Sequence, residues 1–313
     1  MINQKNTPLN QSDRFKKMLP WLLVALFMAT IALYGFSVAQ ARLLQDDYCY
    51  FSILDETRFF QSQAHSYTSV ITYSGNRYSL SFNMGLIDLL GGVKIYPFLP
   101  WIIILFWLTG LYFFTKTILQ LFNIDLEPWK TVLISELIIL FNLALTPNWI
   151  QVFYWSSGRV PYLTPTIWIG WLFFLIFHPS QKAKWAHSLS LLAVFLIAFY
   201  IGGFSETVNF ALITISIIVH LFSFLAPRLK YARALAITAT VAALLSLAFL
   251  YFSPVVQMRA TSLYGETSNL WVALLRSVRG GLRFFFSFVK HRPFFLLAAF
   301  VIINLLGSIL FKD

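Results

Sequence analysis

Long apolar runs are the feature of this sequence that most narrows the folds open to it. A helix needs about 20 residues to cross roughly 30 Å of hydrocarbon. Eight runs approach or reach that length, and we expect a membrane-spanning helix in each: 19–39, 97–119, 131–147, 162–178, 188–204, 206–226, 232–253 and 294–311. The sequence therefore predicts an all-α integral membrane protein in which residues 1–313 form a single polytopic domain.

The composition favours the same class. Hydrophobic residues make up 58% of the chain and charged residues 11%, against about 25% charged residues in an average soluble domain. The 23 Lys and Arg exceed the 12 Asp and Glu, which gives a net charge of +11. In a membrane protein such an excess is typical of cytoplasmic loops and of contact with anionic lipid. We therefore expect membrane lipids as partners and no nucleic acid.

The basic residues between the runs predict the orientation. Lys and Arg accumulate in cytoplasmic loops, and here they gather on the side of the N-terminus: Arg14, Lys16, Lys17, Lys116, Lys130, Lys182, Lys184, Arg228, Lys230 and Arg233. We predict that the chain lies in the cytoplasmic membrane with residues 1–18 as a cytoplasmic tail. The segments 40–96, 148–161, 204–206 and 254–293 then face outward.

Two segments depart from a plain multi-pass pattern. Ala39-Gln40-Ala41 has the small-x-small form of a signal-peptidase site, but the apolar run before it is longer than that of a signal peptide, which favours an uncleaved anchor. The outward segment 254–293 is basic, and its Arg276, Arg279 and Arg283 fall on one helical face. This pattern indicates an interfacial helix that steers an anionic lipid, or that is simply anchored by these arginines.

Disulfide and metal chemistry find little support. The single cysteine, Cys49, excludes an internal disulfide and a Cys-based zinc site, and we expect it to pack. The five histidines contain no i,i+4 pair, so no histidine metal box is predicted: His65, His178, His187, His220 and His291.

Polar residues in the predicted outward segments mark candidate functional sites, because a charge at membrane depth costs several kcal/mol unless it is paired or hydrated. They lie among aromatic and glycine residues in QDDYCYF (45–51), YSGNRYS (73–79), YWSSGRVPY (154–162) and GGFSETVNF (202–210). Single tyrosines and tryptophans are also typical of the aromatic belt at a membrane interface. The repeated arginine or glutamate among them favours a function.

Taken in order, QDDYCYF, YSGNRYS, FYWSSGRVPYLTP, GGFSETVNF and SPVVQMRA resemble segments of bacterial members of the GT-C superfamily of multi-pass membrane glycosyltransferases. The resemblance extends from the first apolar run to about residue 260. It implies juxtamembrane helices in the outward segments. Members commonly have more spans and a longer chain, so the resemblance implies either a minimal version or a fragment.

The resemblance also implies a chemistry. Such enzymes pass a sugar from a polyprenyl-phosphate donor, usually with inversion, to a glycan, lipid or protein acceptor on the outer face. A carboxylate must accept the proton of the acceptor hydroxyl, and the family's base corresponds to Asp47 or Asp46. Asp47 is favoured because adjacent residues of a helix cannot both point into one cleft. In the alternative the pair binds a divalent metal through oxygen ligands; no cofactor is predicted.

The phosphate leaving group needs cations, and Arg can hold it bidentately. Arg259 is the first candidate, followed by Arg159 and Arg77; for each, the alternative is an arginine that reaches lipid head groups. Glu206 is expected to bind sugar hydroxyls or an arginine, or else to cap the helix that follows it. Tyr48 is expected to line the site beside the acidic pair.

A transporter or flippase for a lipid-linked sugar or another anionic solute remains the alternative function. Transporters usually contain inverted repeats and helices broken near the midplane, whereas here the charged residues cluster on one predicted face. This asymmetry favours chemistry at the outer face. Glu136, within the run 131–147, is expected to hydrogen-bond to another helix.

Overall fold

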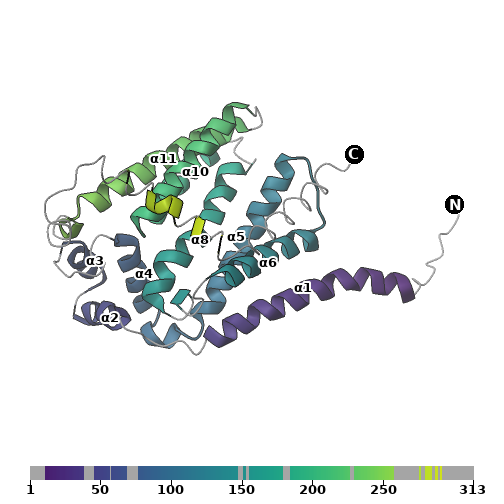
Figure 1. Cartoon of the computed structure of the whole chain (residues 1–313), viewed down its shortest axis with the longest axis horizontal. Coiled ribbons are helices and arrows are strands. Elements are labelled where there is room, and N and C mark those ends of the chain that lie inside the picture. Colours follow the sequence, from purple (N-terminus) through teal and green to yellow (C-terminus); the bar gives the residue numbers. More distant parts are fainter. Residues whose placement is uncertain are drawn as a thin grey trace. The chain divides into compact units, whose positions relative to one another are not determined.

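The computed structural model of the chain describes residues 11–38, 46–56, 58–68, 77–146, 151–152, 155–178, 184–225 and 229–256, with short pieces at 275, 279–283, 286–287 and 290. Within these residues every regular element is a helix (Figure 1), so the predicted all-α class is confirmed. The chain divides into two units, Met1–Pro254 and Val255–Asp313. The short pieces of the second unit are helical and exposed.

The first unit contains ten α-helices and one 3-10 helix among its described residues. They are α1 (Gln11–Val38), α2 (Asp46–Glu56), α3 (Phe59–Thr68), α4 (Tyr78–Leu89), η1 (Gly92–Ile95), α5 (Leu99–Leu121), α6 (Pro128–Leu145), α8 (Ser156–Phe177), α9 (Lys184–Gly202), α10 (Glu206–Leu225) and α11 (Lys230–Tyr251). Proline stands in the first turn of α5 and α6. It is tolerated there because the N–H groups of the first turn make no hydrogen bond within the helix, so the absence of an N–H in proline breaks none.

Six helices are long and apolar enough to cross a membrane. They are Met18–Phe36 of α1, Leu99–Leu121, Ser156–Phe177, Trp185–Gly202, Glu206–Phe224 and Lys230–Tyr251. These spans match six of the predicted runs, with one difference in length. The predicted run starts at 162, but α8 begins at Ser156 and continues through Pro161 and Pro165. Because of this early start, Arg159 lies inside the helix.

The described residues do not confirm the predicted count of eight spans. α6 overlaps the predicted span 131–147 but is not among the six; it has 18 residues, and Lys130 and Glu136 lie within it. The last predicted span, 294–311, lies outside the described residues.

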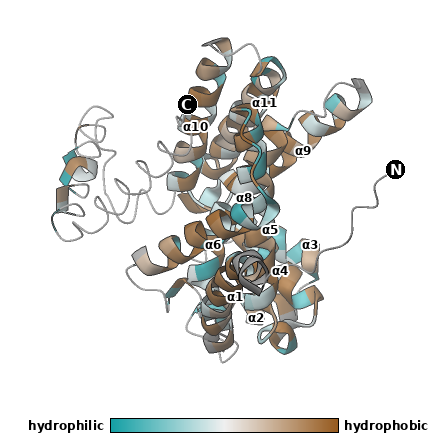
Figure 2. Cartoon of the chain, turned by 90° about the vertical axis from the view of Figure 1, so that its right-hand side faces the viewer, coloured by the Kyte–Doolittle hydropathy of each residue, from teal (hydrophilic) through white to brown (hydrophobic). Residues whose placement is uncertain are grey.

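Apolar side chains also cover the outside of the spanning helices, whose ribbon is mostly brown in Figure 2. Water would penalise so large an exposed apolar surface, whereas hydrocarbon does not. The chain is therefore a multi-pass helical membrane protein. Examples of such exposed side chains are Leu22, Leu26, Leu105, Leu192 and Leu221.

Three apolar clusters hold the first unit together, and α8 contributes to all of them. Leu172 and Ile176, near its C-terminal end, pack with α9, α10 and α11. Leu163 and Ile167 pack with α1, α5 and α6. Val160, in its second turn, joins a cluster formed by α2, α4 and the start of α5. The position of α8 therefore affects every part of the core.

The described residues of the predicted outward segment 40–96 form the short helices α2, α3, α4 and η1, and these pack on one end of the bundle. The backbone N–H of Ser79, in α4, donates to the carbonyl of Gly203 after α9 at 3.3 Å. The hydroxyl of Tyr67, in α3, donates to the carbonyl of Phe249 near the end of α11 at 2.7 Å. The segment thus lies against helix ends that the predicted topology assigns to a single face.

Gly203 allows the closest of these approaches. A Cβ atom added there would overlap the side chains of Ser79 and Tyr78. Only a residue without a Cβ lets α4 pack this closely against the turn after α9.

We predict that Gly203→Ala lowers the free energy of unfolding by about 1–3 kcal/mol, because the added methyl group overpacks this contact. Gly170→Ala in α8 is the matched control, since its Cβ would lie 3.7 Å from the nearest described atom, at ordinary contact distance. Thermal unfolding of both variants in detergent measures the difference. Equal stability of the two variants would contradict the packing described here.

Candidate functional site

Asp47 connects the predicted outward segment to the central helix. Its side chain is fully buried. Oδ1 accepts hydrogen bonds from the N–H and the hydroxyl of Ser157 at 2.8 and 2.6 Å. Oδ2 accepts a third, longer bond from the N–H of Ser156 at 3.3 Å. These serines are the first two residues of α8, so Asp47 binds the N-terminus of that helix.

The N-terminus of α8 needs a hydrogen-bond acceptor from outside the helix, and the Asp47 carboxylate provides it. The first N–H groups of a helix have no intrahelical acceptor, and a side chain at the N-cap position usually supplies one. Here the N-cap residue is Trp155, which makes no capping hydrogen bond. A carboxylate from α2 takes that place, and its negative charge is favourable at the positive end of the helix dipole.

Arg159 lies one turn further into α8 and is 1% exposed. Its Nη2 donates to the hydroxyl of Ser156 at 3.0 Å, and that hydroxyl donates to Oη of Tyr96 at 2.9 Å. The guanidinium carbon is 5.8 Å from the centre of the Tyr96 ring. Nε and Nη1 have no hydrogen-bond partner within the described part of the chain.

Tyr96 remains a neutral phenol in this setting. Burial raises the pKa of Tyr96 to about 12; the charge of Asp47 raises it as well, while the Ser156 hydrogen bond and the charge of Arg159 lower it. A neutral phenol can accept the Ser156 hydrogen bond and still present its ring to the guanidinium.

These residues form a cluster of defined chemistry, which we call the Asp47–Arg159 cluster: Asp47, Tyr96, Ser156, Ser157 and Arg159. A buried guanidinium with two unpaired donors is costly unless an anion satisfies it. A phosphate or carboxylate oxygen would satisfy one of these donors by a charge-assisted hydrogen bond. The cluster is therefore suited to anion binding beside a carboxylate.

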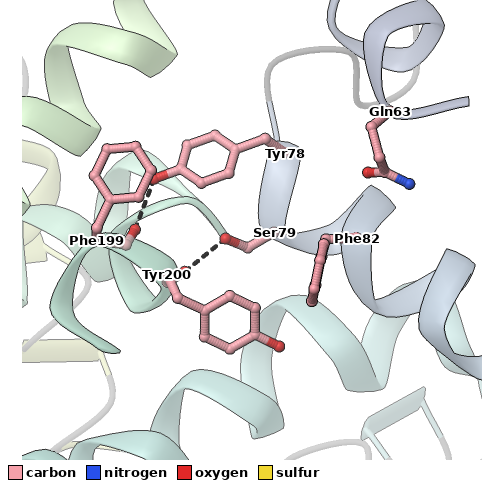
Figure 3. Close-up of a pocket in the computed structure, with 6 residues that line it drawn as sticks. All are labelled: Gln63, Tyr78, Ser79, Phe82, Phe199 and Tyr200. Carbon is pink, nitrogen blue, oxygen red and sulfur yellow. Dashed lines mark hydrogen bonds between the residues drawn. The ribbon is translucent and has the colours of Figure 1, made fainter. Parts of the chain in front are cut away.

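An aromatic pocket of about 250 Å³ lies between α3, α4 and α9 (Figure 3). The polar groups of two of its residues are turned away into hydrogen bonds with backbone carbonyls, Tyr78 to Phe199 at 2.6 Å and Ser79 to Tyr200 at 2.6 Å. Figure 3 shows the rings of Phe82, Tyr78 and Tyr200 around the pocket, with Gln63 on the α3 side. Its surface is thus chiefly aromatic and suits an apolar occupant.

The structure places the other predicted site residues as follows. Asp46 is partly exposed at the first position of α2, and Tyr48 is 61% exposed in the same helix. Arg77 is partly exposed at the N-cap position of α4. Arg259 lies outside the described residues. Of the candidate arginines, Arg159 is the one that the described hydrogen bonds join to the helix end held by Asp47.

The capping alternative for Glu206 has structural support. The hydroxyl of Ser205 accepts a hydrogen bond from the N–H of Val208 at 3.2 Å, which is the bond of an N-cap side chain. Glu206 is exposed and is the first residue of α10, where a negative charge is favourable.

Two minor predictions were wrong. Cys49 is exposed on α2, whereas we expected it to pack. Glu136 is fully buried, but neither of its oxygens has a hydrogen-bond partner within the residues described, whereas we expected an interhelical bond. In the second unit Arg279 and Arg283 are exposed on helical residues, and Arg276 lies outside the described residues.

Some members of the cluster were missed at the sequence level. Tyr96, Ser156 and Ser157 were not named as candidates, although both serines are part of the motif YWSSGRVPY. A serine pair directly before Gly158 and Arg159 is a signal for a helix start. No group of three His, Cys, Asp or Glu side chains that could hold a metal ion is found among the described residues.

Comparisons with known proteins leave the chain without a matched relative. No family model, no curated protein and no solved structure matches it. The functional inference therefore depends on the sequence motifs and on the geometry of the Asp47–Arg159 cluster.

We predict that Asp47→Ala lowers the free energy of unfolding by about 2–3 kcal/mol, because it leaves buried donors of α8 unsatisfied. Asp46→Ala, one residue away and partly exposed, should change it by less than about 0.5 kcal/mol. Thermal unfolding of both variants measures this. A double-mutant cycle with Ser157→Ala should show coupling between positions 47 and 157, and additive effects would contradict the contact.

We also predict that Tyr96 ionises far above the ordinary range for tyrosine. The phenolate difference spectrum between the wild type and Tyr96→Phe should develop as the pH approaches 12 and should be absent at pH 10, because burial disfavours the charged form. Since the folded state holds this proton more tightly than the unfolded chain does, the contribution of Tyr96 to stability should fall as the pH rises above 10. A signal that is half complete at pH 10 would show that Tyr96 is exposed.

Proposed function

We propose that this protein is a membrane glycosyltransferase of the GT-C type, which moves a sugar from a polyprenyl-phosphate donor to an acceptor hydroxyl on the outer face of the cytoplasmic membrane. The observation that carries the proposal is the meeting of Asp47, next to Asp46 in the acidic pair, with the buried, incompletely paired Arg159 at the start of α8. Displacement at a sugar carbon needs a proton acceptor and a site that stabilises the departing phosphate.

In the proposed reaction the acceptor hydroxyl gives its proton to a carboxylate while its oxygen bonds to the anomeric carbon of the sugar. The bond between that carbon and the phosphate oxygen breaks, and its electron pair leaves with the phosphate. The phosphate is already a stable anion, so it needs cations rather than a strong acid. Nε and Nη1 of Arg159 are the donors available for it.

The two aspartates have different environments, and this suggests different roles. Asp47 is fully buried and already accepts three hydrogen bonds. Asp46 is partly exposed next to it. A base must be reached by the hydroxyl that it deprotonates. We therefore assign the base to Asp46 and give Asp47 the role of holding α8 and Arg159 in position, which reverses the order of preference that the sequence suggested.

The aromatic pocket gives the proposal an apolar binding surface. Its six residues include Tyr200, which packs against the same apolar cluster as Tyr96. An isoprenoid chain is a suitable occupant, since the hydroxyls of Tyr78 and Ser79 in the wall are bonded to backbone carbonyls.

The same proposal includes the topology. We propose that α6 and the run 294–311 also cross the membrane, giving eight spans with the N-terminus inside. The helices α2, α3 and α4 then form an outer, GT-C-like layer, and the segment 254–293 also faces outward. Arg77 is proposed to bind the donor from this layer, with Glu206 and Tyr48 contacting the sugar. Arg259, which lies outside the described residues, stays a candidate for binding the donor phosphate.

The test is transfer by the purified chain in vesicles that contain a polyprenyl-phosphate sugar, with an acceptor extract outside. Asp46→Asn should reduce transfer by roughly 10²–10⁴-fold at unchanged stability, because it removes a general base. Asp47→Asn should reduce both transfer and thermal stability. Arg159→Lys keeps the charge but loses the planar guanidinium and its separate N–H donors, and should reduce transfer by at least about tenfold.

Glu127→Gln is the matched control, because Glu127 is an exposed carboxylate bonded to Lys130 and Trp129 at the start of α6. It should leave transfer unchanged. Undiminished transfer in Asp46→Asn would refute the assigned base. Sugar accumulation in the vesicles without transfer would instead support the transporter or flippase.

A further inference from the structure

Glu136 differs from the other polar residues of α6. It is 0% exposed, and neither carboxyl oxygen has a hydrogen-bond partner within the part of the chain that is described. It lies eight residues after Pro128, which corresponds to about 12 Å along the helix axis. The Asp47–Arg159 cluster does not include it.

The neighbouring polar side chains of α6 and of its C-cap residue donate hydrogen bonds to backbone carbonyls four residues earlier in the chain. Ser135 donates its hydroxyl to the carbonyl of Thr131 at 2.9 Å, and Asn142 donates its amide to the carbonyl of Ile138 at 2.8 Å. Thr146 does the same with the carbonyl of Asn142 at 2.8 Å. A side chain can form such a hydrogen bond to a backbone carbonyl only if it has a hydrogen to donate. An ionised carboxylate has none and can only accept, whereas a protonated carboxyl group can donate to a backbone carbonyl as these residues do.

No ion pair to Glu136 is found within the described residues. α1, α5 and α8 pack against α6. On α8, Arg159 is bonded to Ser156 near the helix start, Tyr162 is exposed, and His178 at the C-cap is partly exposed. On α5, Lys116 is exposed and Tyr112 is partly buried. On α6 itself, Lys130 is bonded to Glu127 at 3.1 Å. On α1, Tyr34 is partly buried. The charged residues of α1 all precede Met18: Asp13, Arg14, Lys16 and Lys17, whose side chains lie outside the described set.

We propose that Glu136 is a proton-binding site within the helical bundle, occupied at neutral pH. A bare carboxylate without a hydrogen bond in an apolar core is far more costly than a neutral carboxyl group. Protonation removes that charge and gives the side chain a hydrogen to donate. It also removes one of the two charges of α6, which lowers the cost of placing this helix in hydrocarbon. The ligand of this site is a proton, and the site is separate from the proposed glycosyl transfer.

A hydrophobic carbodiimide tests the proposal, since it reacts with protonated carboxyl groups in apolar surroundings. The carboxyl proton moves to a reagent nitrogen while the carboxyl oxygen bonds to the central carbon, so one reagent molecule is added. Full-length protein in vesicles is treated at pH 7 with dicyclohexylcarbodiimide and analysed by peptide mass spectrometry. Labelling at Glu136 should exceed that at Glu127 by at least about tenfold, the ratio for one pKa unit.

Glu127 is an internal reference of known character, because hydrogen bonds from Trp129 and Lys130 hold the pKa of its carboxyl below the usual range. Glu136→Gln should lose the label, and Glu136→Asp should keep a labelled carboxyl at that position. Equal labelling of Glu136 and Glu127, or no labelling of Glu136, would overturn the proposal.

Infrared difference spectroscopy gives a readout that does not depend on reagent access. Wild type at pH 7 should show the carbonyl band of a protonated carboxylic acid, and Glu136→Gln should lack it. Because Gln is a neutral, nearly isosteric replacement, this variant is expected to fold. A carboxylate band in place of the acid band would also overturn the proposal.

Discussion

The hydrogen bonds between the Asp47 carboxylate and the first turn of α8 are the interaction on which the rest of the structure depends. α8 supplies side chains to all three apolar clusters, so whatever fixes its start also fixes the core. Its N-cap residue, Trp155, makes no capping bond. A residue 109 positions earlier in the sequence provides the acceptor. The first helix of the segment 46–96 is thereby tied to the centre of the bundle.

The same constraint, the high cost of an unpaired polar group away from water, explains the chemistry of the site. Asp47, Ser156 and Arg159 are all at most 1% exposed and are linked through the start of α8. Nη2 of Arg159 donates to the Ser156 hydroxyl, which in turn donates to Tyr96. Nε and Nη1 have no hydrogen-bond partner within the described residues. Buried donors of a cation that the fold does not satisfy are suited to an anionic ligand. This is the physical basis for assigning a phosphate-binding role to Arg159.

Periodicity and composition predicted most of the helices but few of the contacts. Apolar runs of about 20 residues are a strong signal because hydrocarbon leaves few alternatives to a helix, and six of the predicted spans match helices. The start of α8 was placed six residues too late, because the predicted run followed apolar residues only, whereas the first turn of α8 contains the polar residues Ser156 and Arg159, which are buried. Tyr96 was missed because its role depends on a long-range contact with Ser156, and local sequence does not encode such contacts.

The acidic pair and Arg159 were identified from the sequence, yet their relation was not. Adjacent aspartates after a helix indicate a site only through their position along the chain, and sequence cannot say which of the two is buried. The structure separates Asp47, held by three hydrogen bonds, from the partly exposed Asp46. It also shows that Gly203 is required by its close approach to α4, a demand that depends on packing between distant segments.

The central claim is that Arg159 binds the phosphate of an isoprenoid carrier. The most direct measurement is the affinity of the full-length protein for a short isoprenyl phosphate without a sugar, obtained by calorimetry in detergent for the wild type, Arg159→Lys and Arg233→Lys. Arg233 is the control because its guanidinium already bonds to Ser223 and stacks on Phe224. We expect the dissociation constant to rise at least about tenfold in Arg159→Lys alone, because lysine cannot replace the planar guanidinium and its donors. Equal affinity in all three proteins would contradict the claim.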